Sequence, residues 1–185
     1  MKRIAILAAC AVAIPAGAAR AQGMQPYAGM QTRPLKALSA EQITDLRAGR
    51  GMGLALAAEL NGYPGPSHVL ELARELGLSE TQRAQVQAQF AAMQAETVPL
   101  GEELIARERD LDHQFAARTI TPASLTTTMD AIGTAQSRLR TAHLKYHLSM
   151  LDVLTPAQVR RYTELRGYAG ATPPAHTPGM HHQRK

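Results

Sequence analysis

Two long stretches of the chain place apolar residues at spacings of three, four and seven, the repeat of one face of an α-helix. In the first stretch, about residues 80–117, the apolar row consists of Val86, Phe90, Met93, Leu100, Leu104, Leu111 and Phe115. In the second, about residues 122–153, it consists of Leu125, Met129, Ile132, Leu139, Tyr146 and Met150. A short turn near residues 118–121 separates them, so the pattern predicts an antiparallel helical hairpin. We expect a kink at Pro99, which cannot donate a backbone hydrogen bond.

Shorter helices are predicted on both sides of the hairpin. The first runs from about residue 40 to 60 and ends at Asn61-Gly62, the second from an N-cap at Ser67 to Gly77, and the last from about 156 to 166, ending at Gly167. Glycines in the GRGMG segment, residues 49–53, should weaken or bend the first of these helices. No strand precedes that segment, which argues against a phosphate-binding loop. The sequence therefore predicts an all-α fold.

A Leu-Ser/Thr-x-x-Gln motif opens three of the predicted helices. Its copies are Leu38, Ser39 and Gln42; Leu78, Ser79 and Gln82; and Leu154, Thr155 and Gln158. The hydroxyl can accept a hydrogen bond from a free N–H of the first turn, and the glutamine can return one, which makes a capping box. Residues 120–125 repeat the plan with Ser124 in place of glutamine. As pure caps, these motifs predict that Thr155→Ala costs about 1 kcal/mol, and that Gln158→Ala costs less because water replaces part of the lost bond.

The first 21 residues read as a secretory signal peptide. Lys2 and Arg3 precede an apolar stretch, and Ala19-Arg20-Ala21 gives a small-x-small site, with cleavage expected after Ala21. The stretch is too short to span a bilayer, and no later run approaches twenty apolar residues. A periplasmic location without a transmembrane segment follows. The sole cysteine, Cys10, would leave with the signal; a lipid anchor at Cys10 is the alternative.

Removing the signal changes the charge of the chain. It takes away three of 20 basic residues and no acidic ones, so the net charge falls from +5 to 17 − 15 = +2, which argues against a nucleic-acid partner. We expect a flexible segment at 22–37, one helical domain at 38–168 and a disordered tail containing histidine and proline at 169–185. Apolar side chains are mostly Ala, Leu and Met, and a thin layer of such helices gains stability by dimerisation. The expected assembly is an intertwined or cradle-like homodimer.

A pair of histidines on the second arm of the hairpin is the main candidate site. His143 and His147 lie one helical turn apart and can bind one metal ion from one face, while Met150 could add a thioether for a soft ion. A hydrolytic zinc motif would require glutamate at position 144, where the chain has leucine. The alternative interpretation is a pair of histidines at a packing seam.

The tail offers a second group of donors. His176, His181 and His182 could bind copper or zinc without a fold, although ordinary tail composition explains them equally well. No catalytic grouping stands out anywhere in the sequence, so we predict no enzyme. No cofactor is required, and a zinc, copper or nickel ion is the candidate ligand.

The hairpin, the signal peptide and the flanking motifs LSETQ (78–82) and LTPAQ (154–158) resemble the periplasmic Spy/CpxP family, which includes the zinc-resistance-associated ZraP proteins. The resemblance covers roughly residues 67–167. The additional LSAEQ helix and the NGYPGP turn resemble a subgroup of periplasmic heavy-metal sensors. The resemblance implies an all-α, often dimeric cradle that binds unfolded clients or metal ions, without catalysis.

Two functions are therefore expected. The first is a chaperone-like stress protein that holds unfolded or envelope proteins on a helical cradle. The alternative is a periplasmic heavy-metal sensor or buffer whose partner is an inner-membrane sensor protein.

Overall fold

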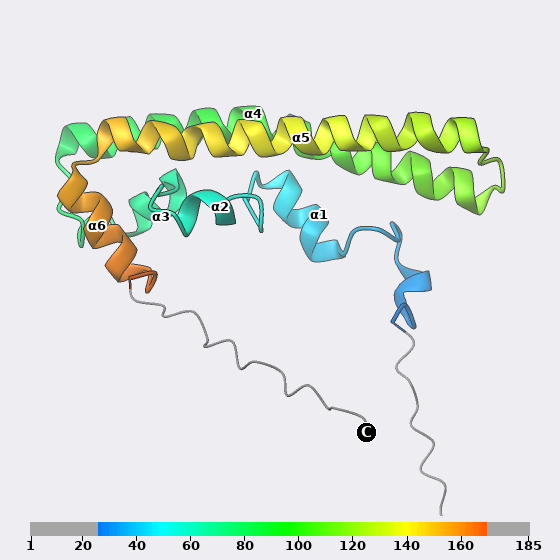
Figure 1. The fold of residues 1–185 in the computed structure, drawn as a ribbon, viewed down its shortest axis with the longest axis horizontal. Helices are drawn as coiled ribbons and strands as arrows, with labels where there is room; N and C mark the ends of the chain where they lie inside the picture. Colours follow the sequence, from blue (N-terminus) through cyan, green and yellow to red (C-terminus); the bar gives the residue numbers. More distant parts are fainter. Residues whose placement is uncertain (1–25, 170–185) are drawn as a thin grey trace, which may run out of the picture. The chain divides into compact units, whose positions relative to one another are not determined.

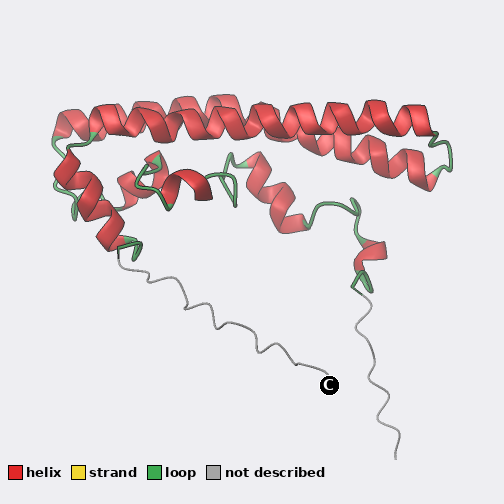
Figure 2. Cartoon of the chain, in the orientation of Figure 1, coloured by secondary structure: helices red, strands yellow, loops and turns green. Residues whose placement is uncertain are grey.

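The computed structural model describes residues 26–169 of a chain that divides into two units, 1–32 and 33–185. In the first unit the described residues form one 3-10 turn, η1 (Met30–Thr32). The second contains α1 (Ala40–Arg47), α2 (Leu56–Glu59), α3 (Pro66–Glu71), α4 (Glu80–Ala116), α5 (Pro122–Val153) and α6 (Pro156–Leu165). Between residues 26 and 169 there is no strand, and the all-α prediction is confirmed (Figure 2). No helix in this range is long and apolar enough to cross a membrane.

The predicted hairpin is present with the predicted limits. Helices α4 and α5 lie side by side, and α4 runs without interruption through Pro99 (Figure 1). Arg118 adopts φ +55°, a conformation that is uncommon for a residue other than glycine, and the N–H of Thr119 bonds to the carbonyl of Gln114. Thr121 then starts α5 with a capping box in which Ser124 returns the bond. The chain therefore reverses within the predicted turn.

All three Leu-Ser/Thr-x-x-Gln motifs form capping boxes. Ser39, Ser79 and Thr155 each accept a hydrogen bond from the N–H of the glutamine three residues later, and the glutamine side chain accepts from the N-cap N–H. These contacts occupy backbone groups that would otherwise lack partners at the start of a helix. The interpretation of the motif as a helix start is confirmed at each copy.

The single helix predicted for residues 40–60 is wrong. The chain instead forms α1 and the four-residue α2, with an irregular segment between them that includes Gly49 at φ +64° and Met52 at φ +44°. A Cβ at residue 49 would lie 2.8 Å from Oγ1 of Thr97, so this glycine also permits a close approach to α4. The glycines break the helix rather than bend it.

The predicted cap of the next helix is also wrong. Helix α3 begins after Gly65, with Pro66 in the first turn, and not after Ser67. The hydroxyl of Ser67 bonds to the carboxylate of Glu71 instead. The helix ends at Glu71, and turns lead to Gly77 at φ +61°.

Two apolar clusters hold the second unit together. The central cluster joins α1, α4 and α5 through buried residues that include Leu35, which lies in the segment 22–37, and Leu46, Leu104, Ile105, Ile132, Ala135 and Leu139. The other cluster consists of Val69, Leu76, Val86, Met150, Leu154 and Tyr162. It lies where α3 and α6 meet the beginning of α4 and the end of α5, and we call this the joined end of the hairpin.

The opposite end of the hairpin, around the turn at 117–121, is called the free end. Its apolar side chains are partly exposed to solvent: Phe115, Leu125 and Met129 are 54%, 38% and 46% exposed. The outermost part of each predicted apolar row is therefore only partly covered by the described residues.

Two of the three motifs meet at the joined end. Nε2 of Gln82 donates to Oε1 of Gln158 (2.8 Å), and Nε2 of Gln158 donates to Oε1 of Gln82 (3.1 Å). The same amide nitrogens reach the carbonyls of Val153 (2.9 Å) and Leu76 (3.3 Å). We call this reciprocal pair the glutamine clasp; it fixes the start of α6 against the start of α4.

Candidate functional site

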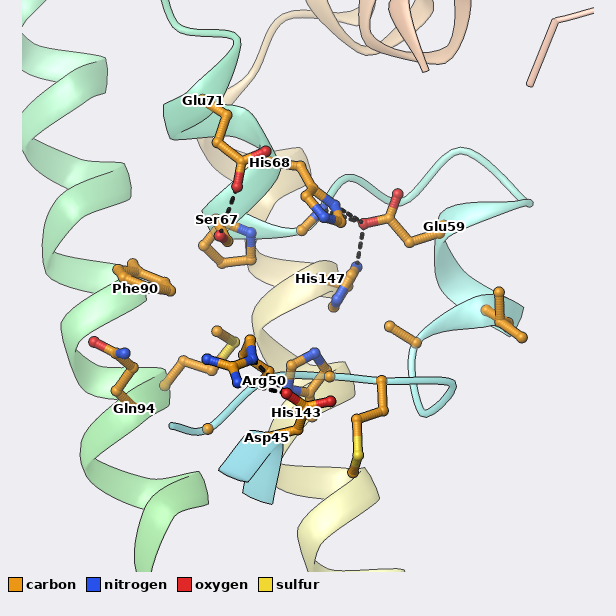
Figure 3. Close-up of a pocket in the computed structure, with 18 of the residues that line it drawn as sticks. Asp45, Arg50, Glu59, Ser67, His68, Glu71, Phe90, Gln94, His143 and His147 are labelled. Atoms are coloured by element: carbon orange, nitrogen blue, oxygen red, sulfur yellow. Dashed lines mark hydrogen bonds and ion pairs between the residues drawn. The ribbon is translucent and has the colours of Figure 1, made fainter. Parts of the chain in front are cut away.

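A cavity of about 570 Å³ lies between the two apolar clusters. Helix α5 contributes His143 and His147, which fall between Leu139 of the central cluster and Met150 of the joined-end cluster. The remaining wall comes from Asp45 of α1, from α4, from the glycine-rich segment 48–55, from α2 and α3, and from residues just after α6. Figure 3 shows both imidazoles projecting from the same helix into this space.

His147 is held in one orientation. Its side chain is 2% exposed, and Nδ1 lies 2.9 Å from the carbonyl oxygen of Tyr63 and 3.9 Å from Oε1 of Glu59. Because a carbonyl oxygen can only accept, Nδ1 of His147 carries a proton, and Nε2 is the ring nitrogen that is left to bind a metal ion. A hydrogen bond from the second nitrogen to a carbonyl is the arrangement found behind most metal-binding histidines.

His143 is buried without such a partner. It is 6% exposed, and within residues 26–169 its ring makes no hydrogen bond. Burial, and then the neighbouring charge of His147, lower the pKa of His143 to about 4. The ring is therefore neutral at pH 7, and its centroid lies 5.4 Å from that of His147.

Two glycines leave room beside these rings. A Cβ at residue 51 would stand 2.4 Å from Nε2 of His143, and one at residue 65 would stand 2.7 Å from Cε1 of His147 and 2.9 Å from Oε1 of Glu59. Any side chain at either position would displace an imidazole. The GRGMG and NGYPGP turns thus have a steric role at the cavity: they bring the backbone to the ring edges without filling the space there.

Glu59 links the cavity wall to α3 and α6. Its carboxylate accepts hydrogen bonds from the N–H of Gly65 (3.2 Å), from Nδ1 of His68 (3.0 Å) and from the hydroxyl of Tyr162 (2.7 Å). Burial alone would raise the pKa of Glu59, but the bonds from His68 and Tyr162 and the charges of His68 and His147 more than offset it, so the pKa lies below its usual value. Burial, and then the bond to Glu59, raise the pKa of Tyr162. Figure 3 shows His68 and His147 directed at this carboxylate.

The structure separates the predicted donors. His143 and His147 lie together at the cavity, whereas Met150 is fully buried in the joined-end cluster and does not line it. The tail donors His176, His181 and His182 lie outside the described residues, as does the predicted signal peptide at 1–21. Within residues 26–169 no three His, Cys, Asp or Glu side chains are arranged to hold a metal ion together.

No pattern in the sequence indicates Glu59, His68 or Tyr162 as members of the site. Glu59 and Tyr162 are 103 positions apart, so no local spacing connects them. The available signal was the cluster of glycines and prolines at 62–66, which marks a close backbone approach but not the residue that it approaches.

The donor set suits an open metal site. Two imidazoles on one helical face can bind a borderline ion such as Zn²⁺, Cu²⁺ or Ni²⁺. The lowered pKa of His143 keeps protons from competing for its ring at pH 7. Two donors leave at least two positions of a tetrahedral ion open. The residues fit a metal ion whose remaining ligands come from elsewhere.

These features define a class: a small helical-hairpin protein with a histidine-lined cavity. Comparison with known families identifies the group within that class. The sequence profile described as heavy-metal resistance matches residues 52–161, more than half of the chain, and the protein belongs to this family. The family is related to the Spy/CpxP/ZraP group, which confirms the resemblance noted from the sequence; its members are typically periplasmic and are not known as enzymes. No curated protein and no solved structure matches the chain.

Proposed function

We propose that the protein binds a heavy-metal ion of the zinc, copper or nickel class in this cavity, through the ring nitrogens of His143 and His147, as a periplasmic metal sensor or buffer. One observation carries the proposal: two buried histidines, one helical turn apart, line the same cavity. Membership of the heavy-metal resistance family supports it independently.

The surroundings of the two rings favour a borderline ion over magnesium or calcium. Hard ions require several oxygen ligands, whereas the cavity wall carries three imidazoles, those of His68, His143 and His147. Its three carboxylates already have partners: Asp45 bonds to Arg50, Glu71 to Ser67, and Glu59 accepts three hydrogen bonds. The carbonyl of Tyr63 and the carboxylate of Glu59 lie beside Nδ1 of His147, on the opposite side of the ring from Nε2, and keep the proton on Nδ1. That arrangement orients Nε2 and makes it a better donor.

Calorimetry with zinc, copper, nickel and cobalt on metal-free protein tests the proposal. We expect His143→Ala and His147→Ala each to weaken binding at least tenfold. His113→Ala, at an exposed position on α4, is the matched control and should leave affinity unchanged. Equal affinities for all four proteins would contradict the proposal.

Gly51→Ala is a sharper variant, because it keeps both histidines. The added methyl group would occupy the position 2.4 Å from Nε2 of His143, so that ring must move. We expect weaker binding with little change in folding. Gly53→Ala, where a Cβ would meet only a side-chain carbon at 3.9 Å, provides the control.

Client binding is the second candidate, and the exposed apolar side chains of the free end favour it. Phe115, Leu125 and Met129 come from both arms of the hairpin and flank its turn. Apolar side chains that remain in water are typical of surfaces that hold other proteins. The assay is suppression of the aggregation of a denatured model protein at near-equal molar ratio without ATP.

The homodimer predicted from the sequence is a separate proposal, and sedimentation of the wild-type protein tests it.

A further inference from the structure

A buried methionine lies on the wall of the two-histidine cavity. Met93 of α4 is 3% exposed and lines the same cavity as His143 and His147. Met150, the other buried methionine of the described chain, belongs to the joined-end cluster and does not line the cavity. Neither of the two apolar clusters includes Met93. Its thioether is therefore a donor at the cavity that packing in the two clusters does not explain.

Hydrogen bonds between α4 and α5 place Met93 level with His147. Two such bonds join the helices around this level, from the hydroxyl of Ser149 to Oε1 of Gln89 (3.2 Å) and from the hydroxyl of Tyr146 to Oε2 of Glu96 (3.1 Å). Met93 lies between the two partners on α4, and His147 lies between the two partners on α5. Packed helices have axes about 8–10 Å apart, so side chains that line one cavity at the same level can reach a common ion.

The neighbours of Met93 on α4 also face the cavity. Phe90 and Gln94 line it, and Figure 3 shows both across the cavity from His143 and His147. The ring of Phe90 has no donor atom, and the amide of Gln94 donates to the carbonyl of Ala48 (3.4 Å). On this side of the cavity, the thioether of Met93 is therefore the soft ligand that α4 contributes.

We propose that the sulfur of Met93 is the third ligand of the ion bound by His143 and His147, and that this donor set selects Cu(I) over Zn²⁺. The inference rests on the proposed function and names both a further ligand and the preferred ion. The ion is then held by both arms of the hairpin, because Met93 comes from α4 and the histidines come from α5.

The chemistry of the three donors favours Cu(I). Thioether sulfur is a soft ligand that suits Cu(I), whereas imidazole binds copper and zinc alike. The side chains of Met93, His143 and His147 are 3%, 6% and 2% exposed, so the ion would be buried. Two imidazole ligands and a thioether bring no negative charge, and a monovalent ion leaves less uncompensated charge in a buried site than a divalent one.

The affinities of the full-length, metal-free protein for Cu(I) and for Zn²⁺ test the inference. Cu(I) binding is measured anaerobically, under reducing conditions, by competition with a chromogenic chelator, and Zn²⁺ binding by calorimetry. Met93→Leu removes the sulfur and keeps the volume of the side chain. Met150→Leu makes the same change at a buried position off the cavity and is the matched control. Circular dichroism checks that each variant is folded.

We expect Met93→Leu to weaken Cu(I) binding about tenfold or more and to leave Zn²⁺ binding nearly unchanged, because only the soft ion depends on the sulfur. Met150→Leu should change neither affinity. Unaltered Cu(I) binding in Met93→Leu would overturn the inference. Equal losses for both ions would overturn it too, because they would show that Met93 acts by packing and not as a ligand.

X-ray absorption of the Cu(I)-loaded protein gives a second measurement. Wild type should show a sulfur neighbour of copper, and Met93→Leu should not. A sulfur that persists in Met93→Leu would assign the ligand to another methionine, such as the half-exposed Met52 on the cavity wall, and would overturn the assignment.

The failure of this inference and the failure of the proposed function give different results. If His143→Ala and His147→Ala bind both ions as tightly as wild type, the proposed function itself fails. If these two variants lose both ions while Met93→Leu keeps its affinity for Cu(I), the histidine site stands and only the role of Met93 is refuted.

Discussion

The two ends of the α4–α5 hairpin share one apolar sequence pattern and differ in how deeply their apolar side chains are buried. At the joined end, Val86, Met150 and Tyr162 are fully buried, whereas at the free end Phe115 and Met129 are about half exposed. The apolar period is continuous from one end to the other. A helical period therefore identifies the face that can be buried, and the neighbouring elements, here α3 and α6, determine how much of it is.

The capping boxes at the two ends also differ, in whether they contact a second helix. Thr121 and Ser124 at the free end satisfy only each other and the local backbone. At the joined end, Gln82 and Gln158 make the same local bonds and also the glutamine clasp across helices. Serine is sufficient for the local bond, but only a long side chain with a free amide N–H can cap its own helix and hold another.

The largest expected contrast is between two methionines on α5. Met150→Ala should lower the free energy of unfolding by about 2–5 kcal/mol, because it leaves a void in a close-packed cluster. Met129→Ala should change it by less than about 0.5 kcal/mol, because that side chain is already 46% exposed and leaves no enclosed void. Urea denaturation of both variants makes the measurement. Similar losses would mean that the free end is covered in solution, for example by a second chain.

The buried ring of His143, in the cavity between the two clusters, should make the metal-free protein sensitive to acid. The pKa of His143 falls from 6.5 in the unfolded chain to about 4 in the folded one, because of burial and then because of His147. The unfolded chain therefore takes up a proton that the folded chain resists, and stability decreases as the pH drops from about 6.5 toward 4. From the pKa difference, the loss between pH 6.5 and 5 is about 2 kcal/mol.

Urea denaturation at pH 7, 6 and 5 in the presence of a chelator measures this loss. Glu59 and His68 also face the ring, from α2 and α3. The pKa of Glu59 is lowered on folding, so the stability that this carboxylate contributes is lost only at pH values below about 4.5, its usual pKa, which lies outside this range. His143→Gln should therefore remove most of the slope between pH 6.5 and 5. A wild-type protein equally stable at pH 7 and 5 would contradict the shift.

The parts of the fold that could be predicted from the sequence are those whose determining contacts are local. The limits of α4, α5 and α6 and all four capping boxes follow from residues within one or two turns of each other. The conformation of residues 48–66 could not be predicted, because the backbone there depends on contacts with α4 and α5. In the candidate site the histidine pair was predictable from its i, i+4 spacing, whereas Glu59 and Tyr162 meet only in the folded chain.

The glutamine clasp changes one expectation drawn from the sequence. As a pure cap, Gln158 should matter less than Thr155. In the structure Gln158→Ala also removes the donor to the carbonyl of Leu76 and both bonds to the amide of Gln82, which keeps only its bonds to Val153 and Ser79, in a half-buried setting. We now expect a loss of about 1–2 kcal/mol, larger than for Ser124→Ala at the free end. Melting curves compare the two variants, with Gln42→Ala, a capping glutamine outside the clasp, as the matched control. Equal losses for Gln158→Ala and Gln42→Ala would show that the clasp adds nothing.

The smallest effect on stability is expected at the free end, where the functional effect should be clearest. Phe115→Ser combined with Met129→Ser replaces side chains that are 54% and 46% exposed, so the free energy of unfolding should stay within about 0.5 kcal/mol of wild type. Zinc affinity should not change either, because neither residue lines the cavity.

If the free end holds clients, suppression of aggregation should fall severalfold, since apolar contact area is lost without unfolding. A double variant that is as stable and as active in that assay as wild type would place client binding elsewhere on the molecule. A double variant that unfolds would show instead that the free end is part of a packed interface, and sedimentation of the wild-type protein would then identify a second copy of the chain as its cover.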